Sequence, residues 1–236
     1  MTMQPKPSKY RISVEQVMPA SAESCLFSHP KCVLGVSMSN PVFWRSSLDK
    51  ILEWMAANFD TSMILVGDYL HRFNEQIVRG GTEEMAAERA LEVGDDFMEQ
   101  LEQYLPKYPA EKFEVVRWQP FHQEPAFWEA KEQMHGLYAS NPEVKASIDS
   151  AATLFVWQKQ DRSRFKVTKS TAVELSAQYL LEEMAVFSML IEKGWEVVIY
   201  PGAQLPLLME IAKGRFKDIP NSLDKGVYVE LKVRKK

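Results

Sequence analysis

KCVLGVS, residues 31–37, is a short and nearly continuous apolar run. Runs of this kind are typical of parallel β-strands that are covered on both faces of a sheet. Beyond it, the apolar residues of 48–59 recur at helical spacing. A buried strand followed by an amphipathic helix is the repeating unit of a doubly wound α/β fold.

The rest of the chain continues this alternation. Further strands are predicted at 63–67 (MILVG), 113–118 (FEVVRW) and 195–200 (WEVVIY), and further helices at 82–104, 142–157 and 170–193. We therefore expect an α/β fold: a single Rossmann-like domain over residues 1–236, with a mostly parallel central sheet and helices on both faces. Polar, proline-containing or basic ends predict loose termini at about 1–9 and 233–236.

The composition excludes several classes of protein. Of the 236 residues, 46% are hydrophobic and 25% are charged, which is ordinary for a globular domain. The longest apolar runs are far shorter than the roughly 18 residues that a membrane span needs. Cys25 and Cys32 and the four histidines show no spacing of a disulfide framework or a zinc site. We expect a cytoplasmic protein with no membrane partner and no metal.

Ligands of such sheets bind beyond the carboxyl ends of the strands, which directs attention to Ser37. The loop that follows it has neither a G-x-G-x-x-G motif nor a G-x-x-x-x-G-K-[ST] motif, so no cofactor and no ATP are expected. Two alternatives stay open here. Ser39 or Asn40 could simply cap the next helix, or Ser37 could serve a hydrolase, although its turn lacks the second glycine of a nucleophile elbow.

Three motifs resemble those of the cyclodipeptide synthases. VLGVS at 33–37, with Asn40 three positions later, resembles the family's first signature. YLLEEMA at 179–185 resembles the second, in which a tyrosine precedes a glutamate by four positions, although Ala185 stands where the family usually has proline. Tyr200 at the end of WEVVIY resembles the late strand tyrosine. The order and the separations agree over essentially the whole chain.

The resemblance implies an enzyme that uses two aminoacyl-tRNAs to form a cyclic dipeptide, a 2,5-diketopiperazine, by a ping-pong route through an aminoacyl-Ser37 intermediate. It also implies a fold similar to the catalytic domains of class I aminoacyl-tRNA synthetases. An aminoacyl ester is already activated, which agrees with the lack of a phosphate loop. Tyr179 and Glu183, at i and i+4, lie on one helix face and could hold the substrate's α-ammonium group. Glu182 is the competing carboxylate. Tyr200 is expected to move a proton during cyclisation.

The family's pocket positions carry over to a predicted substrate site. Asn40 is expected to hydrogen-bond the substrate or its own loop. The first aminoacyl pocket is expected to be apolar or small, because its aligned residues are aliphatic or glycine: Val33, Gly35, Leu65, Val186 and Val198. Asn40 resembles one subgroup of the family and Tyr200-Pro201 the other, so the subgroup and the two amino acids stay open.

Taken alone, the net charge of -4 argues against a nucleic-acid partner, but the charge is unevenly distributed. Residues 83–102 carry eight acids and one base, so that helix cannot cradle phosphates. The predicted tRNA contact is instead the basic segment that holds Lys159, Arg162, Arg164, Lys166 and Lys169, together with the basic tail. We expect a monomer. Solvated loop charges, a small-ester hydrolase and a non-catalytic tRNA-binding module are the alternatives.

Overall fold

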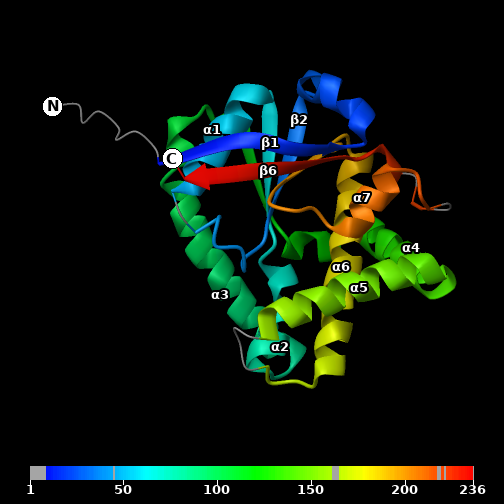
Figure 1. The fold of residues 1–236 in the computed structure, drawn as a ribbon. Coiled ribbons are helices and arrows are strands. Elements are labelled where there is room, and N and C mark those ends of the chain that lie inside the picture. The colour runs from blue at the N-terminus through cyan, green and yellow to red at the C-terminus, as the bar shows by residue number, and fades with distance from the viewer. Residues whose placement is uncertain (1–8, 45, 161–164, 217–218, 221, 236) are drawn as a thin grey trace.

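The computed structural model describes residues 9–44, 46–160, 165–216, 219–220 and 222–235. A six-stranded sheet with the order β1-β6-β5-β2-β3-β4 crosses the molecule (Figure 1). Its strands are β1 (Tyr10–Met18), β2 (Lys31–Val36), β3 (Thr61–Val66), β4 (Phe113–Arg117), β5 (Val197–Pro201) and β6 (Val227–Lys235). All neighbours are parallel except β1 and β6. The predicted α/β class and mostly parallel sheet are confirmed.

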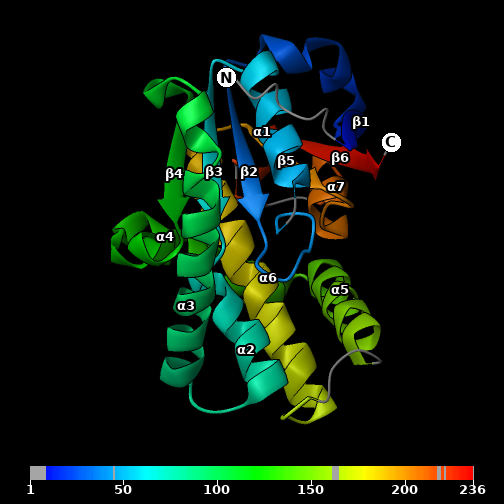
Figure 2. The same ribbon diagram turned by 90° about the vertical axis from the view of Figure 1, so that its left-hand side faces the viewer.

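Helices cover both faces of the sheet (Figures 1 and 2). One face packs against α1 (Ser47–Asn58) and α3 (Glu83–Glu102), and the other against α4 (Pro125–Ser140), α5 (Pro142–Gln160), α6 (Lys169–Glu192) and α7 (Pro206–Ala212). The short helix α2 (Arg72–Arg79) lies between α3 and α6. Strand β2 supplies both cores by alternation, because Val33 faces the α6 side while Cys32 and Leu34 face the α1 side.

Helix α6 is the long helix predicted at 170–193. The Thr168 side chain begins it by accepting a hydrogen bond from the Thr171 amide at 3.2 Å. It ends at Lys193 and at Gly194, which adopts a left-handed φ of 83°. Contacts with α2, α4 and α5 fix its rotation about its own axis, and this rotation determines which of its polar residues reach the sheet edge.

The C-terminal tail corrects one prediction. Residues 233–235 are not loose, because β6 runs to Lys235 and pairs antiparallel with β1, with Tyr10 opposite Lys235. The basic residues hid the end of this strand, which is held by pairing with β1, while its first residues, Val227 to Val229, are buried in the core. Residues 1–8 and 236 lie outside the described part. No helix in the described residues is long and apolar enough to span a membrane.

Candidate active site

The candidate site lies where β2 and β5 end side by side. The two strands are parallel neighbours, with Leu34 opposite Ile199, although the chain continues from β2 to β3 on the other side. This change of direction creates the crevice in which doubly wound sheets bind ligands. Ser37 follows the last residue of β2, and Tyr200 is the penultimate residue of β5. A tight turn closed by the Asn40 amide on the Ser37 carbonyl, at 3.0 Å, leads the chain away.

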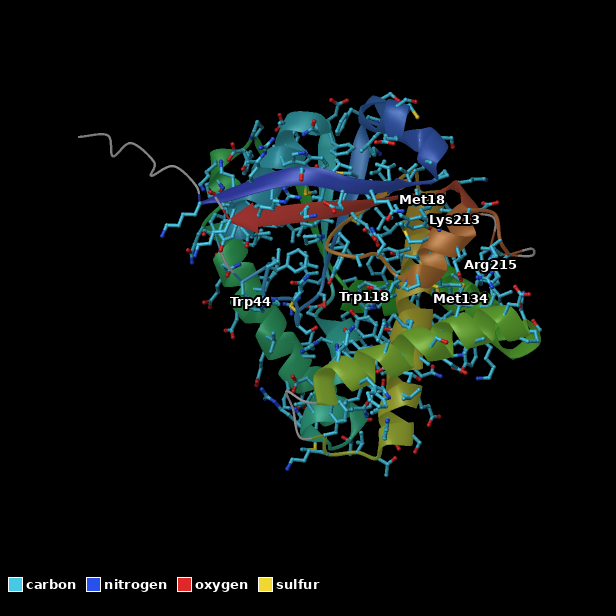
Figure 3. The ribbon with its side chains drawn as sticks, in the orientation of Figure 1. Met18, Trp44, Trp118, Met134, Lys213 and Arg215 are labelled. Atoms are coloured by element: carbon cyan, nitrogen blue, oxygen red, sulfur yellow. The ribbon has the colours of Figure 1, made fainter. Side chains whose placement is uncertain are left out.

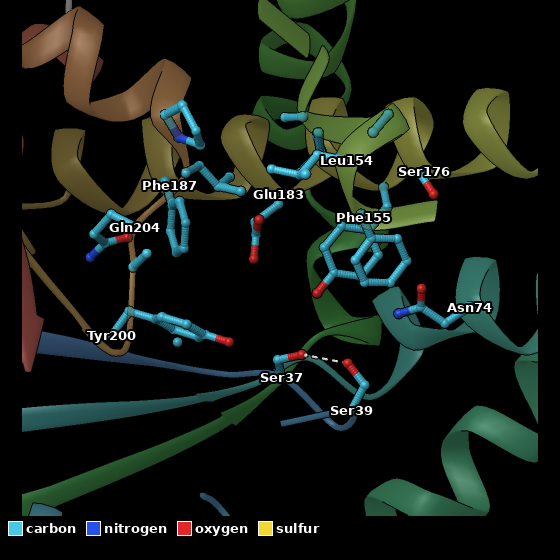
Figure 4. Close-up of a pocket in the computed structure, with 18 of the residues that line it drawn as sticks. Ser37, Ser39, Asn74, Leu154, Phe155, Ser176, Glu183, Phe187, Tyr200 and Gln204 are labelled. Atoms are coloured by element: carbon cyan, nitrogen blue, oxygen red, sulfur yellow. Dashed lines mark hydrogen bonds between the residues drawn. The ribbon is translucent and has the colours of Figure 1, made fainter. Parts of the chain in front are cut away.

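A cavity of about 400 Å³ opens at this edge, and the four predicted catalytic side chains line it (Figure 4). Ser37 comes from the end of β2, Tyr179 and Glu183 from α6, and Tyr200 from β5. Ser37 Oγ lies 3.3 Å from Ser39 Oγ. The structure therefore brings together residues that are up to 163 positions apart in the sequence. No histidine is among the described residues that line this cavity, so Ser37 lacks the base of a hydrolase triad there.

Glu183 is the carboxyl group of the cavity. No described side chain donates a hydrogen bond to it, and burial raises its pKa to about 8. Burial also raises the pKa of Tyr179 well above its usual value, and the charge of Glu183 adds to this effect. The same two causes raise the pKa of Tyr200, while hydrogen bonds with Asn40 and Ser37 oppose the rise. The site thus holds neutral phenols beside a carboxyl group that lacks a counter-ion.

Glu182, the competing carboxylate, faces away from the cavity. It is fully buried and accepts two hydrogen bonds from the Arg72 guanidinium, at 2.9 and 2.8 Å. Lys131 Nζ and His122 Nε2 also lie 3.0 Å from its oxygens, and the indole of Trp118, in the interior (Figure 3), donates at 3.1 Å. Burial raises the pKa of Glu182, but these partners outweigh burial and lower it. These contacts hold the Glu182 carboxylate among its partners, and it is not among the residues that line the cavity.

Asn40 bonds its own loop and β5. Its Nδ2 donates to the Tyr200 hydroxyl at 3.0 Å and to the Pro201 carbonyl at 3.4 Å, and its Oδ1 accepts from the Val42 amide at 3.0 Å. It is not among the cavity-lining residues. It does not cap α1 either, because that helix begins six residues beyond Pro41.

The predicted aminoacyl pocket is corrected in part. Gly35 and Val198 line the cavity, whereas Val33, Leu65 and Val186 do not. These three are completely or almost completely buried, because they form part of the core on which α4 and α6 pack. The ring of Phe187 occupies the space above Gly35, where an added Cβ would lie 3.6 Å from it.

The predicted tRNA residues are only partly described. Lys166 and Lys169 are exposed, and Lys169 Nζ lies 4.3 Å from the ring centroid of the exposed Trp157. Arg162, Arg164 and the side chain of Lys159 lie outside the described part of the chain. The acidic α3 is confirmed as a helix, and two of its acids are ion-paired, Glu83 with Arg72 and Asp95 with Arg117.

The sequence and the fold both match those of known proteins. The family model "Cyclodipeptide synthase" matches residues 18–194. The chain belongs to the cyclodipeptide synthase family. Members of this family are enzymes, and the family assignment supports synthesis of a cyclic dipeptide from aminoacyl-tRNAs. No match is found among curated proteins.

Solved cyclodipeptide synthases share the fold. The structure from Fluoribacter dumoffii has a TM-score of 0.82 at 21% identity, covering 96% of this chain and 99% of that one. A Mycobacterium tuberculosis protein, described as showing that these enzymes are related to type I tRNA synthetases, has a TM-score of 0.72 at 15% identity, with 97% and 94% covered. An enzyme from Candidatus Glomeribacter gigasporarum bound to Phe-tRNAPhe has a TM-score of 0.63 at 16% identity, with 86% of each chain covered.

Several cavity residues lie outside the set of predicted catalytic and substrate-binding residues. Asn74 on α2, Phe155 on α5 and Ser176 on α6 line one side of the cavity, and Gln204 lies on the opposite side (Figure 4). The first three are ordinary residues of helices, and only the packing of those helices brings them to the sheet edge, whereas Gln204 lies in the loop between β5 and α7. Within the described residues, no three His, Cys, Asp or Glu side chains converge to hold a metal ion.

Proposed function

We propose that this cyclodipeptide synthase joins two aminoacyl groups from tRNA by a ping-pong route through an ester on Ser37. The observation that carries the proposal is the composition of one cavity. A serine hydroxyl at a strand end, a carboxyl group without a counter-ion and two phenols converge there. They are the nucleophile, the ammonium receptor and the proton carriers that acyl transfer from an amino ester needs.

In the first half-reaction, Ser37 Oγ attacks the ester carbonyl of the first aminoacyl-tRNA. The serine proton passes to the departing ribose oxygen, so a deacylated tRNA leaves and an aminoacyl ester stays on the enzyme. One ester bond replaces another, so the exchange needs no ATP. Tyr179, whose hydroxyl interacts with Ser37, is placed to orient the serine and to relay its proton.

In the second half-reaction, the α-amine on Ser37 attacks the ester of the second aminoacyl-tRNA, and the second tRNA leaves with a proton. Glu183 is suited to this step because its pKa of about 8 lies near that of an α-ammonium group. It can hold the ammonium ion and then take its proton. The amine at the end of the dipeptide finally attacks its own ester, which frees the cyclic product. Tyr200 gives its proton to Ser37 Oγ and takes up the proton that the amine loses.

The acceptor arm of tRNA is proposed to follow the basic segment 159–169. Exposed Lys166 and Lys169 and the neighbouring Trp157 support this placement, because exposed cations with aromatic rings are a common surface for single-stranded nucleotides. The segment directly follows the cavity-lining residues Phe155 and Gln158 in the sequence. We further propose that the enzyme acts as a cytoplasmic monomer.

The test is incubation of the full chain with tRNA charged with a labelled amino acid. A labelled adduct that survives denaturation, and that is absent from Ser37→Ala, supports the route. Ser140→Ala is the matched control, because its hydroxyl only bonds the Gly136 carbonyl on exposed α4. No adduct with any aminoacyl-tRNA refutes the covalent route, and turnover of simple esters without tRNA indicates a hydrolase instead.

A further inference from the structure

The cavity has two unlike sides, with Ser37 and Glu183 between them. Figure 4 shows Phe187, Tyr200 and Gln204 on one side and Asn74, Phe155 and Ser176 on the other. The first side is apolar, because Val198, Leu205 and Pro206 complete it and the Gln204 amide is occupied by the carbonyls of Val198 and Val229, at 3.0 and 3.2 Å. We call the second side, lined by Asn74, Phe155 and Ser176, the polar lobe.

Ser176 places a hydroxyl group without a described hydrogen-bond partner in the polar lobe. The residue is 4% exposed, and its Oγ is buried with no hydrogen-bond partner among the described residues. Buried hydroxyls normally have a partner, and leaving one unpaired costs about 1–3 kcal/mol. On a helix that faces a cavity, a ligand can supply the missing partner.

Asn74 presents a hydrogen-bond acceptor to the same lobe. It is 8% exposed, and its Nδ2 donates to His71 Nδ1 at 3.2 Å. An amide nitrogen can only donate, so His71 Nδ1 accepts this bond, and His71 Nε2 lies 3.5 Å from Glu75 Oε1. These two contacts hold the Asn74 side-chain amide through its NH2 group. No described residue donates to Asn74 Oδ1, which is therefore available to a ligand.

We propose that the polar lobe selects an amino acid whose side chain is neutral and carries a hydroxyl or an amide group. Such a group donates to Asn74 Oδ1 and exchanges a hydrogen bond with Ser176 Oγ. No charged residue is among the described residues of the lobe, so a charged side chain would lose its hydration there without gaining a counter-ion. The apolar side takes the other amino acid. The product class is a cyclic dipeptide of one apolar and one neutral polar residue, and this inference rests on the proposed function.

The test compares products from the purified full chain, with tRNAs charged with apolar amino acids (Ala, Val, Leu, Phe) and with neutral polar ones (Ser, Thr, Asn, Gln). Mass spectrometry is expected to find mixed apolar and polar cyclic dipeptides as the main wild-type products. Comparison of the products from Ser and Thr with those from Asn and Gln then shows whether a hydroxyl or an amide group is preferred. Ser176→Ala and Asn74→Leu are each expected to lower the polar-to-apolar product ratio about tenfold, the size of one lost hydrogen bond.

Ser188→Ala is the matched control. Ser188 is a buried serine on the same helix whose hydroxyl bonds Ser222 at 2.6 Å, and it does not line the cavity. Its product ratio is expected to equal that of the wild type. Wild-type products without a neutral polar residue overturn the inference, as does an unchanged ratio in both lobe variants.

A binding measurement separates this inference from the proposed function. Stable 3′-aminoacylamino-adenosine analogues carrying asparagine, serine or leucine side chains bind without turnover. Calorimetry is expected to show that both lobe variants weaken the asparagine or serine analogue about tenfold and leave the leucine analogue unchanged. Equal Kd values for the polar analogues in wild type and both variants overturn the lobe assignment. Absence of any product from charged tRNA refutes the proposed function alone.

Discussion

Asn40 and Tyr200 lie 160 positions apart, and the Asn40 side-chain amide donates a hydrogen bond of 3.0 Å to the Tyr200 phenol oxygen. Because the Tyr200 oxygen accepts this hydrogen bond, the proton of its own hydroxyl remains available to another acceptor. The bond also ties the turn after β2 to the end of β5. Asn40 therefore positions Tyr200 and does not need to contact the substrate.

Asn40→Ala is expected to lower the rate of cyclic dipeptide release about tenfold or more, because Tyr200 loses its fixed orientation. The aminoacyl-Ser37 adduct should still form. The ratio of adduct to product, measured with labelled aminoacyl-tRNA, is expected to rise. Asn58→Ala, which removes an amide bonded only to the Trp54 carbonyl of its own helix, is the control. An unchanged ratio would show that Asn40 has no part in the cyclisation step.

Glu183 makes the stability of the fold depend on pH. Burial raises its pKa from 4.5 to about 8, so between these pH values the folded state holds a proton that the unfolded chain has released. The free energy of unfolding therefore falls as the pH rises from about 4.5 to about 8. The measurement is denaturant unfolding of the wild type and of Glu183→Gln across pH 5–9. The difference between their free energies of unfolding, wild type minus variant, is expected to fall as the pH rises to about 8. Parallel curves would contradict the raised pKa.

Glu182→Gln is expected to destabilise the fold by about 3 kcal/mol. The substitution removes the buried carboxylate that pairs with Arg72 and Lys131. Among the described residues it leaves Arg72 with Glu83, an exposed side chain, as its acidic partner, and loss of a buried ion-pair partner is costly. Glu174→Gln, on the exposed face of the same helix, should stay within about 0.5 kcal/mol of the wild type. Urea unfolding measures both. A small effect for Glu182→Gln would mean that its cluster does not hold α6 in place.

Reversal of Arg162 and Arg164 to glutamate tests the tRNA surface. Binding of tRNA should weaken, and the slope of log affinity against log salt should become shallower by about the number of phosphates that the variant no longer neutralises. The control double reversal, Lys213→Glu with Lys225→Glu, changes the net charge equally at exposed residues outside the segment. Equal salt slopes for both double variants would exclude the segment as the tRNA contact.

The sequence was sufficient for the parallel core of the fold, because buried parallel strands and their amphipathic helices carry strong patterns. It was not sufficient for β1, in which polar residues alternate with apolar ones, or for the basic end of β6, which resembles a loose tail until it pairs with β1. The motif spacing led to Ser37, Tyr179, Glu183 and Tyr200, which line one cavity. Helical periodicity alone could not separate Glu183 from Glu182, and the choice of Glu183 rested on motif spacing, because Arg72, 110 positions away from Glu182, helps to fix the rotation of α6. Their catalytic roles remain a proposal.

The pairing of β1 with β6 sets the order in which the sheet can be completed. Among the described strands β1 is made first and its partner β6 is made last. The strands that precede Ser37 and carry Tyr200, β2 and β5, are made before β6. The catalytic crevice can therefore assemble while β1 is still without its partner strand. Shielding that edge until β6 has been made is thus a task for the folding pathway rather than for the folded enzyme.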